Sequence, residues 1–532
     1  MLSKSNEIFP WNPNAISGKN PAILKNYVNG EWKKSKQFKD VINPLNGSPF
    51  IKMPDTQEDE IKPFLEELKR CPKYGLHNPY YNPRRYRMYG DICRDMARYL
   101  RSDAGNKFFT ELINLVMPKG LEQCKGEVDC VAAFLETFSG NGVRNLAVGQ
   151  TTPGDYSGHE PRDYRWPFGP VAVITPFNFP LEIMALQLMG ALFMGNKPVL
   201  KQASTTSIVA EAFVRLLLHC GMPKDDMLFI HCSGSVMEKL VSAKNKDNEF
   251  IVKLIQFTGG SDVAKKLLKI TEGRAKIEDA GFDWKILGPD VPSYTRSYAE
   301  VVAICDKDAY AASGQKCSAQ SILFIHENWG QEERFRAELY SLALKRNLGD
   351  LSIGPVLTWT NKQIQEHIAK LLKINGAFLF FGGKPLIGHK IPSCYGAYEP
   401  TAVFVPLCEI MPNFKIVTTE VFGPVQVVTS WSTKEDLDLI LKMCDRMGNH
   451  LTAAIVDDDP SFINYIVGRT VNGTTYAGLL APTTGAPEWH HFGPCGHPGG
   501  AIIGTPKGII QTWSQERTII SKHAKSLDSF DF

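Results

Sequence analysis

The chain has 532 residues, enough for several domains at roughly 100–200 residues each. Its 43% hydrophobic and 22% charged residues are ordinary globular values, and a net charge of +3 argues against a nucleic-acid partner, which would need a concentrated basic face. The 12 cysteines form no C-x-x-C pair, which argues against a zinc ribbon or disulfide framework, and the lack of any run of about 18 apolar residues argues against a membrane partner.

The first predicted helix starts near Pro63, because Pro fits only the first turn of a helix. Ile61, Phe64, Leu65 and Leu68 fall at helical spacing around it.

From about residue 169, predicted strands and helices alternate. Short apolar runs bounded by Gly and Pro predict strands at 171–175, 198–201, 227–231 and 254–257. The segments between and after them predict helices at 181–194, 207–220, 236–243 and 261–270. Such alternation predicts a parallel sheet covered by helices on both faces, with ligands bound beyond the carboxyl ends of the strands.

A second alternating unit follows residue 317. It has predicted helices at 333–346 and 361–375 and predicted strands at 377–381 and 451–456. The polar stretch 149–164 interrupts the first unit and is expected to project from it. The sequence therefore predicts an α/β protein with two units.

Cys317 is the candidate nucleophile. Small neighbours, Ser313, Gly314 and Ser318, leave room for a ligand, and Lys316 adds positive charge that could favour the thiolate. The competing interpretation is an inert structural cysteine, which is common among buried cysteines.

Two further residues follow predicted strands. Glu278 stands at a strand end before Gly281, where a carboxylate could act as general base; the alternative is a solvated surface acid. Asn178 follows the strand that ends at Thr175, and its side-chain N–H could face a developing oxyanion; the alternative is turn chemistry between prolines.

Two glycine-containing stretches are candidate ligand sites. Residues 257–261, Phe-Thr-Gly-Gly-Ser, link a strand to a helix whose first N–H groups suit a phosphate, although a plain tight turn fits as well. His490, His491, Cys495 and His497 lie in a Gly- and Pro-rich stretch without a shared helical face, so no metal site is predicted.

Taken in order, these motifs resemble the aldehyde dehydrogenase superfamily. The motifs are Thr-Pro-Phe-Asn-Phe-Pro at 175–180, Phe-Thr-Gly at 257–259, the Glu at 278, Gly-Gln-Lys-Cys at 314–317 and Glu-Val-Phe-Gly-Pro at 420–424. The resemblance runs from about residue 26 to residue 520. Stretches at 165–169, 278–290, 471–477 and 483–487 are similar to the plant-type family 12, the 1-pyrroline-5-carboxylate dehydrogenases.

The resemblance implies a Rossmann-like NAD-binding domain, an α/β catalytic domain and a β-ribbon for oligomers. It implies catalytic roles for Cys317 as nucleophile, Glu278 as base and Asn178 with the Cys317 backbone N–H as oxyanion hole. It implies that the cofactor is held by Thr175, Pro176, Phe177, Lys201, Ser204, Thr258, Gly259, Gly260, Ser261, Glu420 and Phe422. It implies that the substrate carboxylate is held by Ser318, Gly485 and Ala486.

Three features depart from the common pattern. The usual Glu-Leu-Gly-Gly is Glu-Asp-Ala-Gly at 278–281, and Glu278 and Cys317 are further apart in sequence than usual. Ser204 stands where strict NAD users often carry Glu, which would repel a 2′-phosphate. The resemblance thus implies NAD and leaves NADP open.

The implied reaction is oxidation of L-glutamate γ-semialdehyde to L-glutamate in proline breakdown, through a thiohemiacetal and a thioester. The alternatives are a reductase or acylating enzyme on the same fold, such as a γ-glutamyl phosphate reductase, a general aliphatic aldehyde dehydrogenase, and an inactive structural relative. The first needs no water-activating Glu, so Glu278 speaks against it, and the 483–486 anchor speaks against the second.

The expected domains are 1–144 with 168–280 for NAD, 281–490 for catalysis, and 145–167 with 491–532 for oligomerisation, the ribbon drawing on the C-terminal strand near 518–520. The expected partners are the small-molecule semialdehyde and further copies of the chain, as a homodimer or larger homo-oligomer. Residues 1–20 lack the features of a secretory signal or transit peptide. The family resemblance implies the mitochondrial matrix, with the cytoplasm as the alternative.

Overall fold

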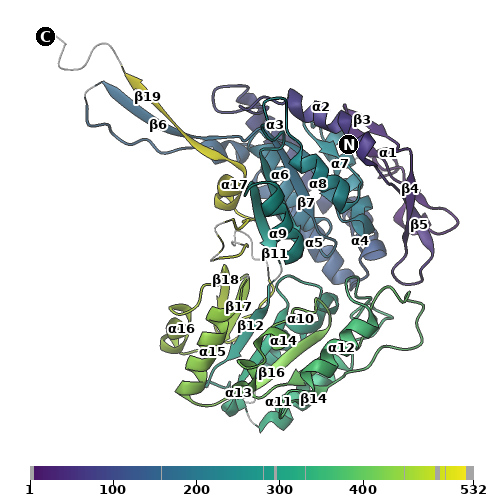
Figure 1. The fold of residues 1–532 in the computed structure, drawn as a ribbon, viewed down its shortest axis with the longest axis vertical. Helices are drawn as coiled ribbons and strands as arrows, with labels where there is room; N and C mark the ends of the chain where they lie inside the picture. The colour runs from purple at the N-terminus through teal and green to yellow at the C-terminus, as the bar shows by residue number, and fades with distance from the viewer. Residues whose placement is uncertain are drawn as a thin grey trace.

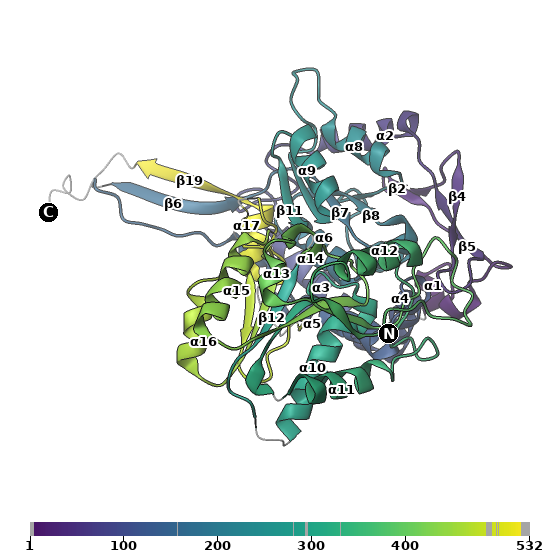
Figure 2. The same cartoon turned by 60° about the horizontal axis from the view of Figure 1, so that its bottom comes forward.

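The computed structural model describes residues 5–156, 158–279, 281–292, 296–329, 331–448, 450–485, 492–495, 497 and 499–522. Two bodies, each built on a seven-stranded sheet, lie one above the other, and a long two-stranded ribbon projects from the upper one (Figure 1). The same separation is visible after rotation (Figure 2). The α/β fold expected from the alternating pattern is confirmed.

The first sheet has a parallel part that carries the predicted strands. In spatial order its strands are β11 (Ala275–Asp279), β10 (Leu254–Gly259), β7 (Pro170–Thr175), β8 (Lys197–Gln202), β9 (Leu228–Phe229), β2 (Asn26–Val28) and β3 (Glu31–Lys33). β11 to β9 run parallel, and β2 pairs antiparallel with β9. The carboxyl ends of the parallel strands therefore share one edge.

Hydrophobic clusters cover both faces of this sheet. The helices of this body are α1 (Ser5–Ile8), α2 (Lys62–Arg70), α3 (Arg84–Arg101), α4 (Asp103–Val116), α5 (Leu121–Thr137), α6 (Glu182–Phe193), α7 (Ser207–His219), α8 (Gly234–Ser242), α9 (Ser261–Ile270) and α17 (Pro506–Trp513). Residues 183–193 of α6 are all buried, because this helix is apolar all round and lies between the sheet and other helices.

The second sheet forms the lower body. In spatial order its strands are β14 (Phe378–Phe381), β15 (Thr401–Phe404), β16 (Val425–Trp431), β13 (Gln320–His326), β12 (Asp283–Leu287), β17 (Thr452–Val456) and β18 (Thr474–Ala477). Only β14 is antiparallel to its neighbour. Its helices are α10 (Arg296–Tyr310), α11 (Gln331–Ala343), α12 (Asn361–Leu371), α13 (Leu407–Ile410), α14 (Phe414–Val417), α15 (Lys434–Arg446) and α16 (Pro460–Val467).

The chain passes from the first sheet to the second between β11 and β12. Two smaller sheets complete the fold: β1 (Ala22–Ile23), β5 (Pro49–Pro54) and β4 (Phe38–Ile42) form one, and β6 (His159–Trp166) with β19 (Gln515–Lys522) forms the ribbon. β6 and β19 pair antiparallel along their whole length. This is the pairing expected between the 145–167 stretch and the C-terminal strand.

In the described part of the chain, no helix has the length and apolar character needed to span a membrane.

Candidate active site

Glu278 lies near the carboxyl end of β11, where Thr258 of the neighbouring β10 stands directly opposite it. Burial raises the pKa of Glu278 to about 7, and Asp279 contributes to the rise. Hydrogen bonds from the Thr258 hydroxyl and the Cys317 thiol oppose it. The carboxyl group therefore lies close enough to the thiol to interact with it. The interpretation of Glu278 as a solvated surface acid is wrong, because only 3% of the residue is exposed.

Cys317 follows a backbone turn in the left-handed region. Ala312 (φ 53°), Ser313 (φ 57°) and Gly314 (φ 69°) carry the chain from α10 to the thiol. The Ser313 hydroxyl donates to the Gly354 carbonyl at 3.0 Å and accepts from the Gly354 N–H at 2.7 Å. Such strained backbone persists only where its surroundings hold it, as they do here.

The thiol is surrounded by acids. Burial raises the pKa of Cys317 well above its usual range, and the carboxyl groups of Glu278, Asp283, Glu420 and Glu182 raise it further. A raised pKa favours the neutral thiol in the free protein, so the thiol must lose its proton before it can attack.

The structure directs Lys316, the cation expected to favour the thiolate, to a backbone carbonyl. Its amine donates to the Lys307 carbonyl at 3.1 Å. Burial lowers the pKa of Lys316 itself to about 8. This contact between the Lys316 amine and a backbone carbonyl cannot be read from the spacing of residues in the sequence.

Asn178 stands in the turn after β7, with 2% of its surface exposed. The turn is held by its backbone: the Gln202 amide donates to the Pro176 carbonyl at 2.6 Å, and the Lys119 amine donates to the Asn178 carbonyl at 3.1 Å. Among the described residues, no hydrogen bond uses the Asn178 side-chain amide. That amide can therefore donate to a ligand.

The same edge of the first sheet carries the residues expected to hold the cofactor. Thr175 ends β7, Lys201 lies in β8, and Ser204 opens the short helical turn that follows β8. Burial lowers the pKa of Lys201, and Lys39 adds to this effect while Cys232 opposes it.

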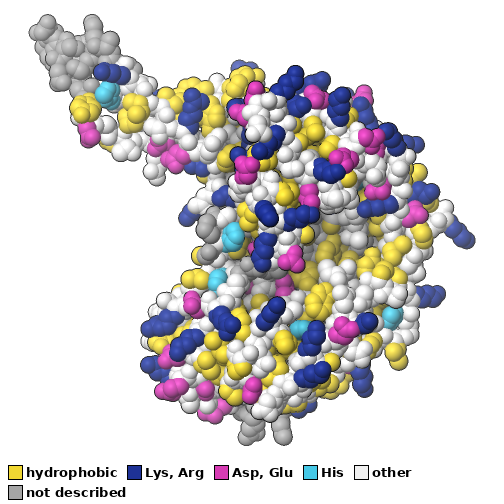
Figure 3. All heavy atoms as spheres, viewed as in Figure 1, with side chains coloured by type: hydrophobic (Ala, Val, Ile, Leu, Met, Phe, Trp, Pro, Cys, Tyr) yellow, Lys and Arg dark blue, Asp and Glu magenta, His cyan; other side chains and the backbone are white. Residues whose placement is uncertain are grey.

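Thr258 and Gly259 end β10, Gly260 is the N-cap of α9, and Ser261 is its first residue. A Cβ atom added at Gly260 would meet nothing within 4 Å, so the start of α9 faces open space. Backbone N–H groups at a helix start bind phosphate, so these residues fit a dinucleotide pyrophosphate. Figure 3 shows the molecule hollowed between its two bodies.

Glu420 and Phe422 reach this site from the second body. The Phe422 ring packs edge-on against Phe177 of the first body, with ring centroids 6.0 Å apart. Burial raises the pKa of Glu420 well above its usual range, with Asp283, Glu278 and Asp279 adding to the rise. The structure thus brings both sets of predicted cofactor residues to one place.

The expected substrate anchor adjoins the thiol. The Ser318 hydroxyl donates to Thr484 Oγ1 at 3.2 Å, and the Thr484 hydroxyl donates to the Ser318 carbonyl at 2.9 Å. Gly485 is exposed, and its carbonyl accepts from the Tyr476 hydroxyl. Ala486 lies outside the described residues, as do His490 and His491.

Three buried groups around this site escaped sequence reasoning. Asp308 accepts from the Thr483 N–H at 2.6 Å and from the Lys285 amine at 2.7 Å, which ties the anchor to α10 and β12. Glu182 opens α6, and burial raises its pKa to about 7. A charged residue between apolar ones in a strand, as Lys285 is between Trp284 and Ile286 in β12, was the available signal. Among the described residues, no cluster of His, Cys, Asp or Glu suits a metal ion.

A cysteine that interacts with a buried carboxyl group, beside a sheet edge that fits a dinucleotide, is the arrangement expected of a cysteine-dependent oxidoreductase. Comparison with known proteins specifies the family: the model of the aldehyde dehydrogenase family matches residues 32–494. The chain belongs to this family and is an NAD(P)-dependent dehydrogenase.

Two relatives are similar in sequence over nearly the whole chain. It is 52% identical to a probable aldehyde dehydrogenase of Linum usitatissimum, covering 95% of this chain and 90% of the relative. It is 49% identical to the mitochondrial delta-1-pyrroline-5-carboxylate dehydrogenase 12A1 of Arabidopsis thaliana, covering 98% and 92%. The fold matches Staphylococcus aureus betaine aldehyde dehydrogenase in complex with NAD⁺, at 20% identity, a TM-score of 0.79, and coverage of 96% and 98%.

Proposed function

We propose that this enzyme oxidises L-glutamate γ-semialdehyde, formed by hydrolysis of 1-pyrroline-5-carboxylate, to L-glutamate with NAD. The observation that carries the proposal is the contact between the Cys317 thiol and the Glu278 carboxyl group. The 49% identity to a protein named for this substrate supports the choice of aldehyde. Ser204 carries no charge that would repel a 2′-phosphate, so NADP is a second cofactor to test.

In this proposal the Cys317 thiol passes its proton to solvent and attacks the aldehyde carbon as a thiolate. Asn178 and the Cys317 backbone N–H donate to the resulting oxyanion, because donors placed where charge develops stabilise the transition state. NAD, when bound, supplies the acceptor for the hydride that leaves this carbon. Glu278 then removes a proton from water, which attacks the thioester and releases the acid and the thiol.

The position of Glu278 also bears on the alternatives. An acylating enzyme on this fold passes its acyl group to an acceptor other than water. A reductase takes its acyl group from an acyl donor such as an acyl phosphate and reduces it to the aldehyde, so neither needs a base that activates water at the thiol. Here the base is buried at the thiol with a pKa of about 7, the value that suits proton transfer near neutral pH. This favours hydrolysis of the thioester.

The wider assignments are also proposals. Residues 1–144 and 168–280 bind NAD, 281–490 provide the thiol and the substrate anchor, and 145–167 with 491–532 serve oligomerisation. A two-stranded ribbon is marginal alone in water; β19 is largely exposed and β6 is only partly buried, so burial against another copy would stabilise it. The name of the Arabidopsis relative favours the mitochondrial matrix.

A substrate panel tests the proposal. Pyrroline-5-carboxylate, succinate semialdehyde and hexanal are each offered with NAD and with NADP, and kcat/KM is measured from NADH or NADPH absorbance. We expect the highest kcat/KM with pyrroline-5-carboxylate and NAD. A preference for hexanal would contradict the substrate assignment.

Replacing Ser318 with alanine should raise the KM for glutamate semialdehyde by roughly 10-fold or more, because a hydrogen bond to a charged group contributes about 1.5–3 kcal/mol. Hexanal has no carboxylate, so its kcat/KM should stay within about threefold, a change of less than 1 kcal/mol. Ser321→Ala is the matched control, since that hydroxyl donates to the Ala319 carbonyl at 3.4 Å. Equal losses for both aldehydes would contradict the anchor role.

The rate of thioester hydrolysis should rise with pH between about pH 6 and pH 8. Glu278 has a pKa of about 7, so the base form is scarce below that pH and dominant above it. Single-turnover decay of the acyl-enzyme across this range measures the effect. A rate that is independent of pH would contradict the assignment of Glu278 as base.

A further inference from the structure

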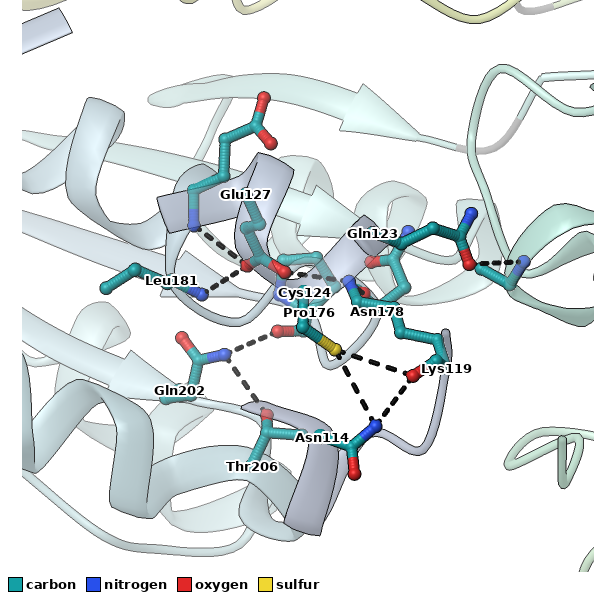
Figure 4. A network of polar contacts seen from close by, with 12 residues as sticks. Asn114, Lys119, Gln123, Cys124, Glu127, Pro176, Asn178, Leu181, Gln202 and Thr206 are labelled. Atoms are coloured by element: carbon teal, nitrogen blue, oxygen red, sulfur yellow. Dashed lines mark hydrogen bonds and ion pairs between the residues drawn. The ribbon is translucent and has the colours of Figure 1, made fainter. Parts of the chain in front are cut away.

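Helix α5 contacts both halves of the proposed oxyanion hole, together with a buried ion pair near its start. Lys119 precedes α5, and Glu127 lies within it; their side chains form an ion pair of 2.7 Å, and both are fully buried. A buried pair of this kind needs further hydrogen bonds to offset the loss of water, and each partner here makes them. Figure 4 shows the network.

Lys119 holds the turn that carries Asn178. Its amine donates to the Asn178 carbonyl at 3.1 Å and lies 4.2 Å from the centre of the Phe179 ring. The backbone of Lys119 is itself fixed, because its carbonyl accepts from the Asn114 amide at 2.7 Å. The amine therefore reaches Asn178 from an anchored position.

Glu127 holds the next part of the same segment. One carboxylate oxygen accepts from the Leu181 N–H at 2.7 Å and from the Glu182 N–H at 3.1 Å, while the other receives the Lys119 amine. The two N–H groups belong to the start of α6, which leaves such groups without helical partners. A single carboxylate thus fixes the start of α6, whose first residue lies four positions after Asn178.

The same helix contacts the other half of the hole. The Gln123 side-chain oxygen accepts from the Ala312 N–H at 3.2 Å, in the left-handed turn that leads to Cys317. α5 therefore contacts both the Asn178 turn and the Cys317 turn. No reacting atom touches Lys119 or Glu127 in the proposed mechanism, so their role is positional.

We propose that the Lys119–Glu127 pair, with Gln123, sets the oxyanion hole by fixing the Asn178 turn against the Cys317 turn. The inference rests on the proposed roles of Asn178 and Cys317. Removing the pair would leave both donors present but displaced, and catalysis would fall because oxyanion donors act only at the right distance from the reacting oxygen.

The test is a double-mutant cycle in the full-length enzyme. Lys119→Met and Asn178→Ala are made alone and together, and kcat, KM and the Kd for NAD are measured for each folded variant. If the pair positions Asn178, Lys119→Met should lower kcat about 10–100-fold, somewhat less than loss of an oxyanion donor. In the presence of Asn178→Ala, the same substitution should lower kcat little further. The Kd for NAD should stay within about twofold of the parent value, less than 1 kcal/mol.

Lys197→Met is the matched control. Lys197 pairs with Glu67 at 3.0 Å and is also buried, but it lies at the opposite end of β8 from the site. Its loss tests stability and should leave kcat within about threefold. If Lys119→Met does not fold, Glu127→Gln replaces it, since the amide keeps the size and an acceptor for α6, and the same pattern is expected.

Three results would overturn the inference. If Lys119→Met or Glu127→Gln folds and has the kcat of the parent enzyme, the pair has no positioning role, while the proposed aldehyde oxidation is unaffected. A loss that adds fully to that of Asn178→Ala shows that the pair acts elsewhere. An unchanged kcat in Asn178→Ala overturns both the oxyanion assignment and the inference.

Discussion

Replacing Cys317 with alanine is expected to abolish aldehyde oxidation and to leave dinucleotide binding intact. The thiol is the atom that bonds to the aldehyde carbon in the proposed mechanism, and Cys317 is the cysteine whose thiol interacts with Glu278. NADH production should fall to the background rate, whereas titration with NAD, followed by calorimetry, should give a Kd close to that of the parent enzyme. The proposed NAD contacts are made by other residues and survive the change.

Cys305→Ala is the matched control for this variant. Cys305 is buried in α10, in the cluster that packs against the second sheet, and its pKa is raised to about 11 chiefly by burial. Cys305 packs in this hydrophobic cluster and takes no part in the proposed mechanism, so its loss should leave kcat within about threefold. Turnover retained by Cys317→Ala would refute the assignment of the nucleophile.

Replacing Glu278 with glutamine is expected to separate the two halves of the reaction. Oxidation to the thioester needs the thiol and the oxyanion donors, whereas hydrolysis needs a base at the water. The variant should therefore release up to one equivalent of NADH per active site quickly and then turn over roughly 100–10,000-fold more slowly, the range that general base catalysis contributes. Rapid mixing followed by steady-state assay resolves both phases.

Asp279→Asn is the control for the loss of a carboxylate. Asp279 is adjacent in β11, so its side chain points to the other face of the sheet. Its charge raises the pKa of Glu278, so its removal should shift the pH profile toward acid without removing turnover. A Glu278→Gln enzyme with the full steady-state rate would show that another group activates the water.

The residues that sequence reasoning located share one property. Asn178, Thr258 and Glu278 stand at or just beyond the carboxyl ends of parallel strands, and a parallel sheet brings those ends to one edge. The apolar runs that define the strands can be recognised in the sequence, and the positions that follow them could therefore be predicted. Cys317 and Glu420 belong to the second body, and the order of the family motifs predicted that they join the residues of the first body at the site.

What sequence reasoning missed depends on contacts between distant elements. Lys119 and Glu127 are eight residues apart in the sequence. They become a buried ion pair only because α5 packs against the Asn178 turn. Lys316 adjoins Cys317 in sequence, yet its amine is taken by a carbonyl of α10. The left-handed turn at Ala312 and Ser313 is held by Gly354 and Gln123, so residue type alone did not predict it.

The most direct test of the account is to identify the acyl-enzyme. Glu278→Gln is mixed with NAD and either glutamate semialdehyde or glutarate semialdehyde, quenched in acid after the burst, digested and analysed by mass spectrometry. Glutarate semialdehyde has no amino group that could release the acyl chain by internal attack. The account predicts one acyl group on the peptide that contains Cys317, in proportion to the NADH formed. NADH formed without any acyl group on that peptide, or with the acyl group on another cysteine, would contradict it.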